Sequence, residues 1–386
     1  MKKMLPLEGV RIIEVGQALA APLAATIMAD MGADVIKVEK PDGGDDARLW
    51  GPPFGPDGKT SLYFHGQNRN KRSIVLDIKR SEDIETLHRL CETADILIQN
   101  LRLGIVERCG ISAEVMCARH PRLVYCNISS FGQTGPMCNR PAFDPLMQAY
   151  GGMMSMTGRP SEEPNLCGAS INDKATGLFS VIGVLAALRK RDVTGVGGIV
   201  DTSLLETAVH WVETPLNAYF ATGDIPMRHG TGGAMIVPYQ AFHASDVAFV
   251  IAAGNDRMFA SCAMVLGHPE WAIDTRFAAA AQRVVNKEAL ITEMRKVILT
   301  QTRDFWIAKL TAADVPCAPI HNLGELAEAD QFIHMDMTQI LPDSEVKVVG
   351  LPISFDRERP RSARSSPELG EHTQEVLAEL DSLRSK

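Results

Sequence analysis

Gly9-Val-Arg-Ile-Ile-Glu-Val15 opens the stretch that decides the fold, because a short β-branched run bounded by glycines is typical of a strand. Residues 16–31 follow as a turn and an apolar helix, with Pro22 in the first turn, where proline is well tolerated. Ala33-Asp-Val-Ile-Lys-Val38 is then a second strand. A strand, a helix and a strand in this order predict a βαβ unit, and therefore a parallel sheet.

The same alternation of strands and helices continues along the chain. Further segments with the composition of strands are residues 73–78, 96–100, 123–127 and 199–203. The turn after the first strand lacks the G-x-G-x-x-G spacing of a dinucleotide site, which argues against a dehydrogenase. We therefore expect an α/β fold with a Rossmann-like large domain and a parallel sheet.

The length of 386 residues exceeds the size at which one core usually suffices, so two domains are expected. From about Thr222 the sequence changes to a glycine-rich loop, short strand-like segments and short helices. We expect residues 1–223 to form the first part of the large domain and residues 224–330 a smaller α+β domain. Residues 331–386 are expected to return to the large domain.

Composition limits the classes of function. A net charge of -8 argues against nucleic-acid and anionic-membrane partners. The eight cysteines form no C-x-x-C pair and the ten histidines no H-E-x-x-H, so no structural metal is expected. Scattered cysteines and the lack of a signal-like start indicate a reduced, cytoplasmic protein. No uncharged run is long enough to span a bilayer.

Asp173 stands where a loop turns into a long apolar helix, within Gly168-Ala-Ser-Ile-Asn-Asp-Lys-Ala-Thr-Gly177. An aspartate at a helix start is often only an N-cap, which accepts a free backbone N–H. It can also be a carboxylate nucleophile, which needs no general base. Gly177 lies one turn later on the same face and leaves room beside the carboxylate. The residues alone leave both interpretations open.

Two further features have a structural and a functional interpretation. The basic cluster Asn68-Arg-Asn-Lys-Arg72 precedes a strand, and is either a solvated face or a phosphate site. The glycine-rich loop at Gly230–Gly233 is either a turn or a close approach of backbone to a ligand. The absence of G-x-S-x-G and of G-x-x-x-x-G-K-[ST] disfavours an α/β-hydrolase and a P-loop enzyme.

With these motifs in order, the chain resembles the class III CoA-transferases, the family of formyl-CoA and carnitine CoA-transferases that also contains α-methylacyl-CoA racemase. The resemblance covers almost the whole length. Its motifs are weak singly and specific together: Gly9–Val15, Ala33–Pro41, Asn70-Lys-Arg-Ser73, Ala94–Asn100, Phe131-Gly-Gln-Thr-Gly-Pro136, Asp173-x-x-x-Gly177, Val315-Pro-Cys-Ala-Pro319 and Leu369-Gly-Glu-His-Thr373.

The resemblance implies roles for individual residues. Asp173 falls on the nucleophile, and Gln17 on a polar residue that lines the active site. Gly232 and Gly233 fall on a loop that covers the reacting group, although the glycine run is shorter here. The positions implied to hold the phosphates and adenine of CoA are Lys40, Lys71, Arg72, Asn100 and Arg108. Ser129 and Ser130 stand where some members have a lysine, which puts that contact in question.

The resemblance also implies the reaction. A CoA-transferase would move CoA from a donor such as succinyl-CoA to a small dicarboxylate, through an aspartyl anhydride and an aspartyl-CoA thioester. It would act as an interlocked homodimer, with no tightly bound cofactor and a CoA thioester as substrate. Phe143 stands where the racemases carry a histidine, and it cannot exchange a proton. An α-methylacyl-CoA racemase or epimerase and a non-catalytic acyl-CoA-binding protein are the alternatives.

Overall fold

The computed structural model describes residues 4–384, which form two compact units. The first unit contains the chain up to residue 153, residues 166–218 and the chain from residue 335 onward. The second contains residues 154–165 and 219–334. The short segment 154–165 thus joins the second unit from a distant place in the sequence, a connection that the composition of the chain does not reveal.

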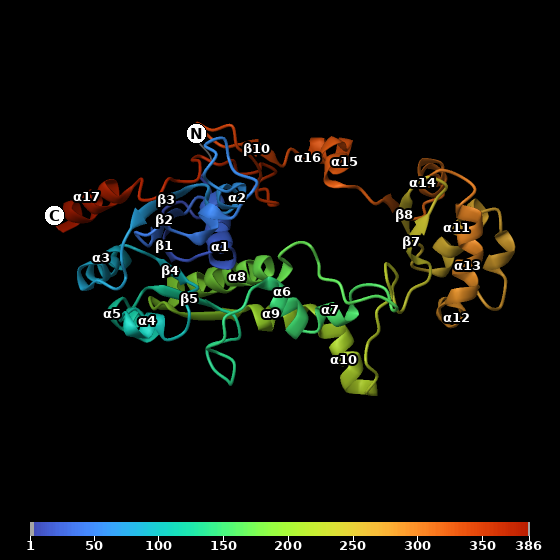
Figure 1. Ribbon diagram of the computed structural model, residues 1–386, viewed down its shortest axis with the longest axis horizontal. Helices are drawn as coiled ribbons and strands as arrows, with labels where there is room; N and C mark the ends of the chain where they lie inside the picture. Colours follow the sequence, from blue (N-terminus) through green and yellow to red (C-terminus); the bar gives the residue numbers. More distant parts are fainter. Residues whose placement is uncertain (1–3, 385–386) are drawn as a thin grey trace. The chain divides into compact units, whose positions relative to one another are not determined.

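A parallel sheet of six strands forms the centre of the first unit, which confirms the predicted α/β class (Figure 1). Its order is β3-β2-β1-β4-β5-β6. The strands are β1 (Arg11–Val15), β2 (Asp34–Glu39), β3 (Lys71–Val75), β4 (Ile96–Gln99), β5 (Val124–Ser129) and β6 (Gly198–Ser203). The order reverses between β1 and β4, and open α/β sheets bind their ligands at such a reversal.

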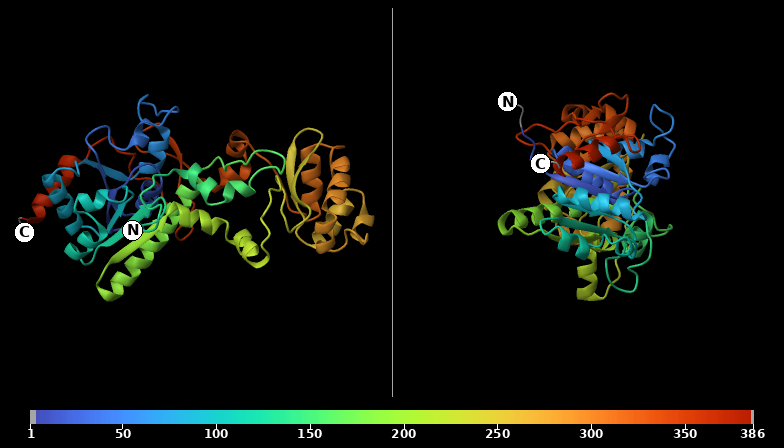
Figure 2. Two further views of the ribbon diagram at one scale, coloured as in Figure 1. Left: turned by 60° about the horizontal axis from the view of Figure 1, so that its bottom comes forward. Right: turned by 90° about the vertical axis from the view of Figure 1, so that its left-hand side faces the viewer.

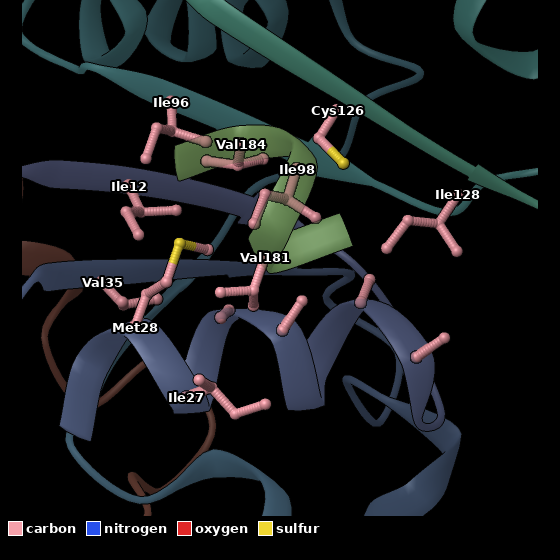
Figure 3. Packing of buried hydrophobic residues seen from close by; sticks show 14 of the residues in the cluster. Ile12, Ile27, Met28, Val35, Ile96, Ile98, Cys126, Ile128, Val181 and Val184 are labelled. Atoms are coloured by element: carbon pink, nitrogen blue, oxygen red, sulfur yellow. The ribbon is translucent and has the colours of Figure 1, made fainter. Parts of the chain in front are cut away.

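One face of the sheet is covered by α1 (Ala20–Asp30) and α8 (Ile171–Thr194). Because parallel strands are buried on both faces, they are nearly continuous in apolar residues. Side chains of the strands and of both helices interlock in one cluster (Figure 3), whose members include Ile12, Val35, Ile98, Met28, Val181 and Val184. This packing fixes the first turn of α8 relative to the sheet.

The other face is covered by α3 (Ser81–Glu92), α5 (Ala113–Arg119) and the C-terminal α17 (Thr373–Arg384). Helix α17, red in Figures 1 and 2, packs beside β3 although it comes from the opposite end of the chain. Val376 and Leu380 are the buried side chains of α17 within this core. The C-terminal segment therefore completes the large unit.

The remaining elements of the first unit are short connections and small helices. The apolar segment after β6 forms two helices, which are divided at Val212. The bounds are η1 (Asp46–Leu49), α2 (Leu62–Asn68), α4 (Ile105–Arg108), α6 (Asp144–Tyr150), α7 (Met153–Met156), α9 (Leu204–Trp211), α10 (Glu213–Thr222), β10 (Thr338–Ile340) and β11 (Lys347–Val349), of which α7 and α10 run across unit boundaries.

The second unit has an antiparallel sheet of β7 (Tyr239–His243), β8 (Ala248–Ala252) and β9 (Cys317–Pro319). Its core contains Phe249, Phe259 and Trp306. Its other elements are α11 (Asp256–Val265), η2 (Pro269–Ala272), α12 (Ala280–Val285), α13 (Lys287–Ile298), α14 (Arg303–Ala312), α15 (Leu323–Glu328) and α16 (Asp330–Met335), the last of which reaches the unit boundary.

Helix α8 combines great length with close packing. By length and composition it would be able to cross a membrane, with a mean hydropathy of 1.3 over its most apolar window, of which 44% is buried. Gly177 serves its packing against α1, because a Cβ there would lie 2.9 Å from the carbonyl oxygen of Ala20. The prediction that Gly177 leaves room beside Asp173 is therefore wrong: the space is filled by α1.

Candidate active site

A cavity of about 600 Å³ opens at the carboxyl edge of the sheet, where the strand order reverses. The residues that follow β1, β4 and β5 contribute Gln17, Asn100 and Ser130 to its wall. The start of α8 contributes Asp173, and Trp50 and Tyr63 add aromatic rings with centroids 5.3 Å apart. All the lining residues belong to the first unit.

Asp173 lies in the first turn of α8 and does not cap the helix, whose N-cap position is Ser170. The capping groups come from Asp144 instead: its Oδ2 accepts the backbone N–H groups of Asn172 (2.6 Å) and Asp173 (3.1 Å). Gln148 donates its side-chain amide to the other oxygen of Asp144 at 2.6 Å. The interpretation of Asp173 as an N-cap is therefore wrong, because a second carboxylate performs that role.

The side chain of Asp173 is partly buried, and within residues 4–384 no group donates a hydrogen bond to its carboxylate. Burial, and secondly the negative charge of Asp144, raise the pKa of Asp173 from 3.8 to about 7. The helix dipole favours a negative charge at this position, so desolvation outweighs it. A carboxylate held in a cavity with a raised pKa and no internal partner is typical of a functional group.

Tyr63 stands in the same cavity wall. Burial, and secondly the charge of Asp173, raise the pKa of its phenol far above the ordinary value. The hydroxyl therefore keeps its proton and can donate a hydrogen bond within the cavity. This residue is one that the sequence motifs did not bring to attention.

Gln17 and Asn100 are brought together across the reversal of the sheet. The side-chain amide of Asn100 accepts the backbone N–H of Gln17 at 2.9 Å and donates to its carbonyl oxygen at 2.8 Å. Gln17 lines the cavity, and its side chain makes no hydrogen bond within the described part of the chain. The two predicted residues thus share one site, with Asn100 engaged by the backbone of Gln17.

Lys71 and Arg72 were expected to hold CoA phosphates, and the structure contradicts this. The Lys71 side chain is fully buried, with its ammonium 2.7 Å from the carboxylate of Glu14. Arg72 is also buried and pairs with Asp34 and Glu379 at 2.7 and 2.6 Å. The basic cluster is neutralised inside the protein, so neither cation is available to an anionic ligand.

Lys40 and Arg108 do not themselves line the cavity, although Asp46, the partner of Lys40, does. Lys40 is exposed and pairs with Asp46 at 2.6 Å, beside a small pocket of about 40 Å³. Arg108 is exposed on α4 and is not part of the cavity wall. Gly232 and Gly233 belong to the second unit, where their N–H groups donate to the carbonyl oxygens of His229 and Tyr239.

Two arginines that the sequence motifs missed do line the cavity. Arg102 and Arg140 are exposed, and neither makes an ion pair within residues 4–384. Arg102 follows the end of β4 by three residues, so the rule that ligands bind at strand ends would have identified it. Arg140 lies in the loop before α6 and carries no comparable signal in the sequence. Both guanidinium groups are free to bind a carboxylate or a phosphate.

The chain is similar to known proteins over nearly its whole length. Residues 7–373 match the model of CoA-transferase family III. Succinate–glutarate CoA-transferase of Agrobacterium fabrum is 37% identical, over 98% of this chain and 96% of the relative. Acetyl-CoA:oxalate CoA-transferase of Acetobacter aceti is 35% identical, over 91% of each chain. The solved structure of a CAIB/BAIF family protein from Brucella suis has a TM-score of 0.87 and 38% identity, over 98% of this chain and 100% of its own.

The raised pKa of Asp173 predicts a stability that depends on pH. Because the folded pKa of about 7 lies above the ordinary 3.8, the native state retains a proton that the unfolded chain releases. Ionised Asp173 therefore costs stability, increasingly from pH 4 to 7. We expect Asp173→Asn to be more stable than wild type by roughly 1–2 kcal/mol at pH 8, with allowance for solvent screening, and equal at pH 4.

Denaturant unfolding at both pH values measures this difference. Asp173→Ala should behave like Asp173→Asn, because Asp144 rather than Asp173 supplies the capping oxygen. The matched control is Asp201→Asn, which should show no gain in stability at pH 8. Asp201 lies on β6, and its carboxylate accepts a hydrogen bond from the side chain of Asn127. A loss of stability in Asp173→Ala at pH 8 would contradict the assignment of the cap.

Proposed function

Because the chain belongs to CoA-transferase family III, we propose that it transfers CoA from succinyl-CoA to a small dicarboxylic acid. The observation that carries the proposal is Asp173, a residue of the cavity wall whose carboxylate accepts no hydrogen bond from residues 4–384. The names of its relatives support dicarboxylic substrates, since they include succinate, glutarate and oxalate. Transfer between two acids needs one carboxylate that accepts an acyl group and then CoA.

The proposed reaction runs through Asp173 in four steps. Its carboxylate oxygen attacks the thioester carbonyl of succinyl-CoA, and the thiolate of CoA leaves, which gives a mixed anhydride. The thiolate attacks the aspartyl carbonyl of the anhydride, which releases succinate and leaves an aspartyl-CoA thioester. The acceptor carboxylate displaces the thiolate from this thioester and forms a second anhydride. The thiolate then attacks the acceptor's carbonyl, which gives the new acyl-CoA and restores the Asp173 carboxylate.

The groups around Asp173 fit this reaction. Each attack creates a negative oxygen, which donors in the cavity can stabilise. The backbone N–H groups of Asn172 and Asp173 at the start of α8 already donate to Asp144. The carboxamide of Gln17 and the hydroxyl of Tyr63 belong to residues of the cavity wall and are able to donate, and we assign the role to them.

Racemisation is not favoured by this site. It would need a second group that exchanges a proton, and Phe143 lines the cavity at the position where racemases carry a histidine. Residues 4–384 contain no group of three or more His, Cys, Asp or Glu side chains placed to hold a metal ion.

We further propose a cytoplasmic homodimer. Its support is an apolar surface on α8 and the neighbouring elements of the first unit, where Leu178, Ile182 and Trp211 are 49%, 62% and 47% exposed. Large exposed apolar patches mark interaction sites, and an isologous contact buries such a patch on both copies. The eight cysteines are all free thiols, which accords with a reducing compartment.

The homodimer can be tested by dilution. An interlocked dimer should sediment as a dimer at nanomolar concentration, because its chains cannot separate without unfolding. Ile182→Glu should weaken or prevent assembly, while Ile273→Glu, which alters an exposed apolar residue of the second unit, is the control. A monomer–dimer equilibrium in the micromolar range would argue against interlocking.

The covalent role of Asp173 can be tested by trapping. Wild-type protein given succinyl-CoA and then hydroxylamine should carry a hydroxamate on the peptide that contains Asp173, and should lose activity. Protein treated without succinyl-CoA should keep that peptide unchanged. Asp173→Asn should fold and lose transfer, because an amide is a poor nucleophile. Wild-type turnover in Asp173→Asn, or a hydroxamate on another carboxylate, would overturn the proposal.

The free arginines predict where anionic substrates are held. We expect Arg102→Gln and Arg140→Gln each to raise the KM of succinyl-CoA or of the acceptor acid by about 10-fold or more, since a hydrogen bond to a charged group contributes roughly 1.5–3 kcal/mol. Arg72→Gln is the matched control: it should lower the melting temperature without a selective change in either KM. Unchanged KM values in both cavity variants would exclude this role.

A further inference from the structure

The loop Gly16-Gln17-Ala18 joins β1 to the start of α1, and side chains from other segments, two of them buried, hold its peptide groups one after another. Lys37 donates to the carbonyl oxygen of Gly16 at 2.8 Å. Asn100 binds both the N–H and the carbonyl oxygen of Gln17, at 2.9 and 2.8 Å. Asp45 accepts the N–H of Ala18 at 3.1 Å. Three side chains from three other segments thus fix the backbone conformation of residues 16–18.

Behind the loop lies a cluster of charges with no contact with solvent. The ammonium of Lys37 lies 2.7 Å from Glu14 and 3.0 Å from Asp45, and the other oxygen of Glu14 lies 2.7 Å from Lys71. All four side chains have an exposed fraction of 0%. A buried ion cluster contributes little net stability, because desolvation offsets the attraction between the charges. Stability alone therefore does not account for it, whereas the fixed geometry of the loop does.

The loop has an unfavourable local conformation. Ala18 has a φ of 66°, in the left-handed region that costs a residue with a Cβ roughly 1 kcal/mol or more. A Cβ at Gly16 would lie 2.7 Å from the Cβ of Ala21, so the chain passes α1 closely. A backbone in this state persists only where its surroundings determine it fully, and strain of this kind gathers at functional sites.

The side chain of Gln17 is in the opposite situation. Asn100 binds both its backbone N–H and its carbonyl oxygen, while its carboxamide has no partner within residues 4–384, and the residue lines the same cavity as Asp173. A polar group that is free on a rigid support is preorganised for a ligand, because no reorganisation accompanies binding.

We propose that Asn100, supported by Lys37 and Asp45, is a positioning residue that holds the Gln17 carboxamide where it donates to the acyl oxygen during attack by Asp173. This inference rests on the proposed function of Asp173. It assigns to Asn100 a different role from the CoA contact that the family resemblance implies, since its amide oxygen and nitrogen are both engaged by Gln17. Asn100 then acts through Gln17 and not on the substrate.

A double-mutant cycle tests this dependence. Gln17→Ala should lower kcat about 100-fold or more, the usual loss for one oxyanion donor. Asn100→Ala should lower kcat by about 10-fold or more and leave the KM of succinyl-CoA within about twofold. In the Gln17→Ala background, Asn100→Ala should change kcat by less than about twofold, because the group that it positions is already absent.

Two further variants separate positioning from general damage. Asn100→Asp is nearly isosteric and keeps the acceptor for the Gln17 N–H, but it repels the Gln17 carbonyl, so it should reproduce the kcat loss if Asn100→Ala does not fold. Gln99→Ala is the matched control, since its buried amide binds Asn127 and the N–H of Leu101 and does not touch the loop. Its effect on kcat should multiply with that of Gln17→Ala.

The outcomes that overturn the inference are distinct from failure of the proposed function. The inference would be overturned if the kcat losses of Asn100→Ala and Gln17→Ala multiply in the double variant. It would also be overturned by a selective rise in the KM of succinyl-CoA for Asn100→Ala, or by an unchanged kcat for Gln17→Ala. If hydroxylamine still labels Asp173 in those variants, the proposed function stands and only the positioning role falls. If wild-type Asp173 is not labelled, the proposed function fails and the inference fails with it.

Discussion

Strands β1 and β4 lie side by side in register, Ile12 opposite Ile96, yet the chain leaves them toward opposite edges of the sheet. The segments that follow the two strands therefore diverge, and an opening at the carboxyl edge results from topology alone. Gln17 follows one strand and Asn100 the other, and the pair of hydrogen bonds between them spans the opening. The cavity, the loop at 16–18 and the place of Asp173 all depend on this divergence.

The start of α8 shows how stability and reactivity are separated. A helix needs acceptors for its first N–H groups, and a local carboxylate would usually supply them. Here Asp144 supplies them from another segment, so the Asp173 carboxylate has no hydrogen-bond partner among residues 4–384. Burial, and secondly the nearby charge of Asp144, raise the pKa of Asp173. Because Asp144 performs the capping role, the carboxylate of Asp173 is available to react.

Local pattern was sufficient to predict the βαβ order, the parallel sheet and the position of Asp173 at a helix start, because these depend on neighbours in the sequence. Partners that come from far along the chain were not predictable. Lys71 and Arg72 look like a phosphate site in isolation, but successive residues of β3 point to opposite faces of the sheet. One face meets Glu14 of β1, and the other meets Glu379 of the C-terminal helix. A basic cluster in a sequence therefore predicts a ligand site only when no acidic side chain from a distant segment pairs with it in the folded protein.

An acidic chain can hold anionic substrates when cations near the site are left without acidic partners. A net charge of -8 repels anions at long range, but screening limits that effect to about 10 Å at moderate salt. What matters within the cavity is the charge that remains after internal pairing. The buried cations Lys37, Lys71 and Arg72 are paired with carboxylates inside the protein. The exposed Arg102 and Arg140 make no ion pair within residues 4–384. The local field at the cavity thus depends on the arginines that the fold leaves without acids, and the position of Arg102 beside a strand end follows from the same divergence that opens the site.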